Sequence, residues 1–152
     1  MRILEKFCIH KLVESQVRQT PNAIAALFST EQITYQELNN KANQLAHYLK
    51  SLGVNSETLI GLCVERSLNM LIGLLAVLKA GSAYVPLDPT YPEDRLAFML
   101  EDSQLPILIT QTHLPRSLPK SNGMRVVCLD SDWQKIEQFS QDNLDSEVSP
   151  DK

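Results

Sequence analysis

The chain has 152 residues, of which 43% are hydrophobic and 21% charged, and its formal net charge is −4. This length suits one domain or one subdomain, and the composition is that of an ordinary soluble globular protein. The 14 basic residues are scattered along the sequence, so the chain lacks the basic patch of a nucleic-acid-binding protein. We therefore expect no nucleic-acid partner.

The sequence also bears on the compartment of the protein. Residues 1–6 run into charged positions without an apolar core segment, so we expect no secretion signal. The longest apolar stretch, residues 70–78, is much shorter than the ~20 residues of a membrane span. The cysteines Cys8, Cys63 and Cys128 are odd in number and far apart, which favours free thiols in a reducing environment. These observations predict a cytoplasmic protein with no membrane partner.

The first predicted elements are a helix and a strand. Residues 9–19 place Ile9, Leu12, Val13 and Val17 on one face at helical spacing. The proline that comes after them, Pro21, cannot continue a helix. The apolar run over residues 23–28 then predicts a short buried strand.

The next helix has the clearest start and end signals in the chain. Thr34 and Glu37 are spaced as a capping box, in which each side chain bonds to the backbone of the other residue. An apolar residue recurs every three or four positions from Leu38 to Leu52. Gly53 comes next, and glycine tolerates the left-handed conformation that ends many helices. The sequence therefore predicts a helix over residues 34–52.

Strands and helices continue to alternate after Gly53. Strands are predicted over residues 58–64, 84–87, 106–109 and 126–129, the second with a proline typical of an edge or a strand end. Helices are predicted over residues 67–81, capped by Ser67, over residues 90–100, with a second capping box of Thr90 and Glu93, and over residues 132–139. This alternation indicates an α/β fold, with a mostly parallel sheet flanked by helices. Residues 1–140 form the predicted domain, and the polar residues 141–152 are predicted to be a disordered tail.

The residues that could carry chemistry do not form a recognisable site. His10, His47 and His113 lie far apart and away from metal-ligand spacing, so we interpret them as surface or hydrogen-bonded structural histidines. The glycines are too scattered to build a phosphate loop. Asp88 and the pair Glu65-Arg66 come directly after predicted strands, where α/β sheets hold ligands. Because Asp88-Pro89 is a good turn dipeptide, we favour a turn there.

Two motifs resemble the first two core motifs of adenylation domains in nonribosomal peptide synthetases. The first is Ile33 to Leu38, followed by Asn43 to Ala46, and the second is Leu78 to Asp88. Residues 91–96 and 108–110 are similar to the segments that come next in those proteins. The resemblance implies a partial N-terminal subdomain of the adenylate-forming enzyme fold. The family reaction makes an aminoacyl-adenylate from an amino acid and ATP with Mg²⁺, then transfers the aminoacyl group to a carrier thiol.

The resemblance implies framework rather than chemistry for this chain. In that family, a segment like residues 148–151 is followed by a strand, a phosphate loop and later ATP-contacting segments, and none of these has a counterpart here. We therefore assign no catalytic, cofactor-binding or metal-binding residue, and expect ATP and Mg²⁺ only for a complete family domain.

Three functions remain open. The first is an inactive fragment of an adenylation domain. The second is one half of a split enzyme that pairs with the remainder of the domain or synthetase. The third is a non-catalytic binding module.

Overall fold

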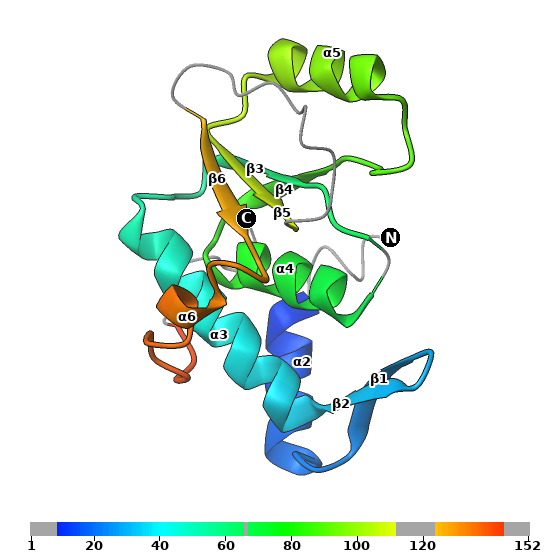
Figure 1. Cartoon of the computed structure of the whole chain (residues 1–152). Helices are drawn as coiled ribbons and strands as arrows, with labels where there is room; N and C mark the ends of the chain where they lie inside the picture. The colour runs from blue at the N-terminus through cyan, green and yellow to red at the C-terminus, as the bar shows by residue number, and fades with distance from the viewer. Residues whose placement is uncertain (1–8, 66, 112–123, 145–152) are drawn as a thin grey trace.

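A computed structural model describes residues 9–65, 67–111 and 124–144. Within these ranges the chain has an α/β fold, in which a parallel four-stranded sheet is flanked by helices (Figure 1). The predicted fold class is confirmed. None of the described helices is long and apolar enough to cross a membrane.

The bounds of the elements agree with the predicted alternation. The helices are α2 (Ile9–Gln19), α3 (Tyr35–Ser51), α4 (Leu68–Lys79), α5 (Glu93–Ser103) and α6 (Trp133–Ile136). The strands are β1 (Ile24–Phe28), β2 (Glu31–Thr34), β3 (Leu59–Leu62), β4 (Ala83–Pro86), β5 (Ile107–Thr110) and β6 (Arg125–Cys128). Every element overlaps a predicted one except β2, which the sequence did not predict.

The sheet has the strand order β4-β3-β5-β6, and all its neighbouring strands are parallel. The chain leaves β3 through α4 to reach β4 on one side, then returns through α5 to β5 on the other side. These two crossovers place α4 and α5 on opposite faces of the sheet, as Figure 1 shows. The prediction for the proline-bearing strand is confirmed. β4 is the edge strand in the order of the sheet, and Pro86 is its last residue.

Each face of the sheet has its own apolar core. On the face of α3 and α4, the core includes the fully buried Ile60 and Leu45. On the face of α5, Leu96 and Leu100 pack around Leu108. Burying a side chain of this size stabilises a fold by roughly 1.5–3 kcal/mol, so both cores hold the sheet in place.

The first strand is not buried, and this prediction was wrong. β1 pairs antiparallel with β2 in a separate hairpin that lies away from the four-stranded sheet (Figure 1). Ile24, Leu27 and Phe28 are 45%, 68% and 41% exposed. A two-stranded hairpin can press only one face on its neighbours, so its apolar run is half covered rather than enclosed.

Two predicted helix caps were also wrong. Ser67 precedes α4 but makes no side-chain cap bond, and its hydroxyl donates to the Glu65 carbonyl at 2.9 Å instead. α5 begins at Glu93 after Pro92, and Thr90 is bound to Asp88 rather than to Glu93. In both places a local turn uses the hydroxyl that was predicted to cap the helix.

Residues 141–144, assigned by the sequence to a tail, lie against α3. Leu144 is 8% exposed and belongs to the core on the α3 side. The rest of the predicted tail, residues 145–152, lies outside the described residues. The division of the chain at residue 140 stays a prediction.

Candidate functional site

The first motif forms the capped start of α3. The Thr34 hydroxyl accepts a hydrogen bond from the Glu37 N–H at 3.1 Å, and the Glu37 carboxylate accepts one from the Thr34 N–H at 3.1 Å. The backbone bond from Thr34, followed by the hydroxyl contact, holds the pKa of the Glu37 carboxyl below its usual range. The predicted capping box is confirmed, and both side chains serve folding.

Four polar side chains of α3 form a surface that we call the amide face, made of Asn39, Asn43, Gln44 and His47. All four hydrogen-bond to a segment that we call the strap, residues 137–144. Three of the accepting groups are backbone carbonyls, those of Glu137, Gln141 and Asp142. The amide face therefore binds three backbone carbonyls of the strap and also the side chain of Asn143, which accepts from Asn39 and Asn43.

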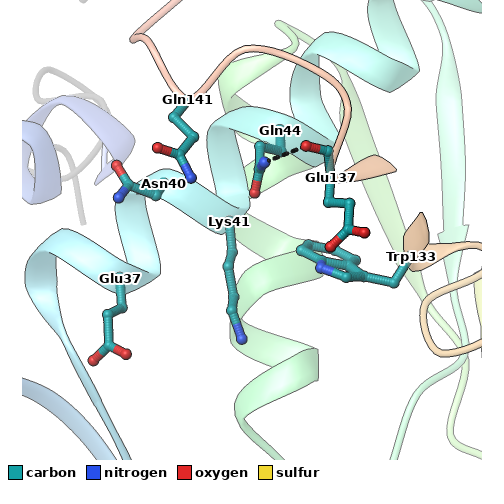
Figure 2. Close-up of a pocket in the computed structure, with 7 residues that line it drawn as sticks. All are labelled: Glu37, Asn40, Lys41, Gln44, Trp133, Glu137 and Gln141. Atoms are coloured by element: carbon teal, nitrogen blue, oxygen red, sulfur yellow. Dashed lines mark hydrogen bonds between the residues drawn. The ribbon is translucent and has the colours of Figure 1, made fainter. Parts of the chain in front are cut away.

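An open hollow of about 390 Å³ lies beside this contact (Figure 2). Its lining residues are Glu37, Asn40, Lys41, Gln44, Trp133, Glu137 and Gln141. The bond from Gln44 Nε2 to the Glu137 carbonyl, 2.9 Å long, forms part of the wall. Glu37 is already used by the helix cap, and Lys41 is exposed to solvent. The hollow is open to solvent, so it lacks the enclosure that strengthens charge interactions in a reaction site.

The second motif forms a helix-to-strand corner whose lysine faces inward. Lys79 lies at the end of α4 and its ammonium donates to the Glu14 carboxylate of α2. The two side chains are 0% and 5% exposed. Gly81, with φ 81°, then turns the chain into β4. A lysine buried in this pair is not free to bind a phosphate.

The polar residues that follow β3 and β4 are engaged in hydrogen bonds. Asp88 Oδ1 accepts from the Thr90 N–H at 2.9 Å and from its hydroxyl at 2.7 Å. These bonds, the hydroxyl one first, hold the pKa of the Asp88 carboxyl below its usual range. The predicted turn at Asp88 is confirmed. The Glu65 N–H donates to Gln111 Oε1 at 3.0 Å, and Arg66 lies outside the described residues.

The histidines and cysteines are separated in the fold. His47 contacts the strap, whereas His10 is 3% exposed and its Nε2 has no hydrogen-bond partner within the described ranges. The prediction of a surface or hydrogen-bonded histidine is therefore wrong for this nitrogen.

Cys63 and Cys128 are free thiols, while Cys8 and His113 lie outside the described residues. Over residues 9–65, 67–111 and 124–144, no three His, Cys, Asp or Glu side chains are grouped as metal ligands.

Sequence reasoning missed two features of this arrangement. One is the amide face, because partners about a hundred positions away leave no local pattern. The other is the Lys79–Glu14 pair, for which a signal existed: Lys79 continues the apolar run of α4, where an exposed lysine would interrupt the buried face.

A family model described as "AMP-binding enzyme" matches residues 13–152 of the chain. A linear gramicidin synthase of Brevibacillus parabrevis is 48% identical over 136 residues, which make up 90% of this chain and 3% of that protein. Tyrocidine synthase 3 of Brevibacillus parabrevis is 46% identical over 143 residues, or 94% of this chain and 2% of that protein. The chain thus spans only a few per cent of the length of these relatives.

Solved structures agree with the sequence relatives. The nonribosomal peptide synthetase FmoA3 superposes with a TM-score of 0.84 at 31% identity, covering 94% of this chain and 15% of that one. The N-terminal subdomain of Klebsiella oxytoca NpsA gives a TM-score of 0.74 at 20% identity, covering 93% of this chain and 35% of that one, a likeness of fold alone. The resemblance seen in the two motifs is confirmed, and the chain belongs to the AMP-binding enzyme family, matching the N-terminal part of adenylation domains of nonribosomal peptide synthetases.

Proposed function

We propose that these 152 residues supply framework for amino-acid adenylation and form no aminoacyl-adenylate by themselves. One observation carries the proposal: the polar residues of the two motifs are already committed to folding. Thr34 and Glu37 cap α3, and Asp88 holds a turn. Lys79 is buried in an ion pair. Groups that are bonded in this way are not available to bind ATP.

The described residues do not fit a site for ATP and Mg²⁺. Mg²⁺ in such sites is held by one or two carboxylates together with substrate phosphates, and transferring phosphates need several aligned cations or N–H donors. The carboxylates of Glu37 and Asp88 already accept hydrogen bonds from backbone N–H groups, and the ammonium of Lys79 is buried in its ion pair with Glu14. Among the residues that line the hollow, Lys41 supplies a single ammonium on an open surface. We therefore derive no phosphate chemistry from these residues.

Pyrophosphate exchange tests the proposal directly. The purified chain is incubated with ATP, Mg²⁺, labelled pyrophosphate and all twenty amino acids. A complete adenylation domain from a gramicidin synthase is run in parallel, so that a failed assay is recognised. We expect labelled ATP from the complete domain and none above the protein-free blank from this chain. Amino-acid-dependent exchange by the chain alone would refute the proposal.

A second candidate is complementation, in which the chain and a separate polypeptide together form the enzyme. The sheet favours it, because Leu59 and Tyr84 near its β4 edge are 42% and 38% exposed, and Phe98 on α5 is 65% exposed. Exposed apolar groups and a bare strand edge are typical of surfaces that bind more polypeptide. The relatives also contain far more chain than this one.

Mixing experiments test complementation. The chain is combined with the part of a relative's adenylation domain that lies after the matched region. Exchange that occurs in the mixture and in neither part alone supports complementation. A matched control uses the chain with Tyr84→Lys, which places a charge at the exposed edge. Full activity with this variant would exclude the β4 edge as the contact.

We infer a reducing, cytoplasmic location from the thiols. Cys63 is fully buried without a disulfide partner, and Cys128 is also free, which fits a compartment that keeps thiols reduced. A disulfide involving either residue in protein extracted under alkylating conditions would contradict this location.

A further inference from the structure

Three titratable side chains are buried where α2 packs against α4. His10 and Glu14 on α2 are 3% and 4% exposed, and Lys79 on α4 is 2% exposed. The framework role proposed above assigns no chemistry to this cluster. It joins the first described helix to the helix that covers the sheet.

The single carboxylate of the cluster already faces two positive charges, so a third would be disfavoured. Glu14 Oε2 accepts from the Lys79 ammonium, and Glu14 Oε1 lies 3.6 Å from the ammonium of Lys11. Both oxygens of the buried carboxylate are therefore already matched by a cation. A protonated His10 would add a third positive charge beside this single carboxylate.

The surroundings of His10 disfavour its protonation in other ways. It is the second residue of α2, so the positive end of the helix dipole acts on it. Its Nε2 has no acceptor within the described part of the chain. Burial is the largest cause that lowers the pKa of His10, and the charges of Lys79 and Lys11 add to it, while Glu14 opposes them. Helix α3 also packs on α2, but none of its charged side chains contributes to the lowered pKa of His10.

From this geometry we propose that His10, Glu14 and Lys79 form an acid-sensitive latch that holds α2 against α4. The latch is closed while the His10 ring is neutral. When α2 swings away, His10 reaches solvent and takes up a proton at its ordinary pKa of 6.5. Mild acid therefore favours the open arrangement, in which the buried Val17 of α2 and the facing surface of α4 become available to other polypeptide.

The linkage between proton uptake by His10 and the opening of α2 sets the size of the pH effect. Below the solvent pKa of 6.5 the open form binds a proton that the closed form excludes, so opening becomes more frequent as the pH falls. Between about pH 7.5 and about pH 5.5, the equilibrium constant for opening rises by up to about tenfold. The gain ends where the closed form also begins to take up the proton.

Hydrogen exchange at the backbone amides of α2 measures this opening. Wild-type chain and His10→Gln are compared at each pH, so that the pH dependence of the chemical exchange rate cancels. We expect wild-type protection of α2 to fall up to about tenfold relative to His10→Gln over the same interval. His47→Gln, which removes a histidine from α3, serves as the matched control and should keep the wild-type dependence. Equal pH dependence in wild type and His10→Gln would overturn the latch.

A second measurement needs no variant. The ¹³C chemical shift of the His10 ring is followed by NMR during an acid titration of the wild-type chain. We expect the ring to titrate below its ordinary pKa of 6.5, and α2 amides to lose protection at higher pH, before the ring of the closed form takes up its proton. A ring that titrates at or above that value in the closed form would overturn the proposal, even if His10→Gln fails to fold.

Discussion

Asn43 in the middle of α3 and Asn143 in the strap are joined across 100 residues of sequence, with Asn43 Nδ2 lying 3.0 Å from Asn143 Oδ1. The same nitrogen donates to the Gln141 carbonyl at 2.7 Å. Asn43 is fully buried and belongs to the first motif. This motif therefore does more than start a helix, since it also fixes the path of the last described segment of the chain.

Asn43→Ala should release the strap. The change removes the donor shared by the Gln141 carbonyl and the Asn143 side chain, and each hydrogen bond lost in this way costs about 0.5–1.5 kcal/mol. Urea unfolding monitored by circular dichroism gives the loss of stability, and hydrogen exchange should show faster exchange of residues 137–144. Asn40→Ala is the matched control, because Asn40 is only half buried and accepts from Gln36 on its own helix. Equal losses for the two variants would contradict a special role for Asn43.

Thr34→Ala should weaken the start of α3. The hydroxyl that accepts from the Glu37 N–H is lost, and removal of such a cap typically costs about 1 kcal/mol. Urea unfolding measures the change, with Thr30→Ala in the exposed hairpin turn as the control. A double variant with Glu37→Ala should lose less than the sum of the single changes, because the two side chains belong to one capping box. Strict additivity would argue against reciprocal capping.

The sequence predicted elements best where the signal was local. Helix α3 carries its cap, apolar stripe and terminal glycine within 20 neighbouring positions, and all three are present in the structure. β2 was missed because its four residues, Glu31 to Thr34, hold a single buried apolar side chain, Ile33. The turn before it, at Ser29, lacks the Asn-Gly or Asp-Gly pair that marks a hairpin.

Contacts that join distant segments could not be predicted from the sequence. The amide face binds backbone carbonyls of the strap, and every residue offers a carbonyl, so the partner has no sequence signature. The burial of Lys79 likewise depends on Glu14, 65 positions earlier. The turn at Asp88 was predicted correctly, because its partner Thr90 is two residues away.

Lys79→Met should be strongly destabilising, although it replaces a charge by an apolar side chain of similar length. It leaves the Glu14 carboxylate buried with only Lys11 nearby, at 3.6 Å, among the described cations. Breaking one partner of a buried pair costs about 3–5 kcal/mol. The double variant Glu14→Leu, Lys79→Met removes both charges and should recover much of the loss in urea unfolding. A double variant as unstable as the sum of both single variants would contradict this account.

Gly61→Ala and Gly53→Ala should destabilise the fold for different reasons. A Cβ at Gly61 in β3 would lie 2.6 Å from Leu105 Cδ1 and 3.0 Å from Leu108 Cδ1, and such overpacking costs about 1–3 kcal/mol. Gly53 has φ 92° with nothing within 4 Å, so alanine there strains only the backbone, by about 1–2 kcal/mol. Leu105→Val removes a methylene near Gly61 and should couple favourably with Gly61→Ala. The same change should not rescue Gly53→Ala, and a rescue of both would refute the packing explanation.

Cys63 should be almost unreactive in the folded chain. Burial, with a smaller contribution from the Asp88 carboxylate, raises the pKa of its thiol to about 11. The thiolate is the reactive form, so only about one molecule in a thousand would be reactive at about pH 8 even if the reagent reached it. In the variant Cys8→Ser, Cys128→Ser, labelling by dithiobisnitrobenzoate should be slow in buffer and complete in urea. Because burial is the larger cause, Asp88→Asn should speed the native reaction only slightly. Rapid labelling of the folded variant would show that the sheet face under α5 is open to solvent.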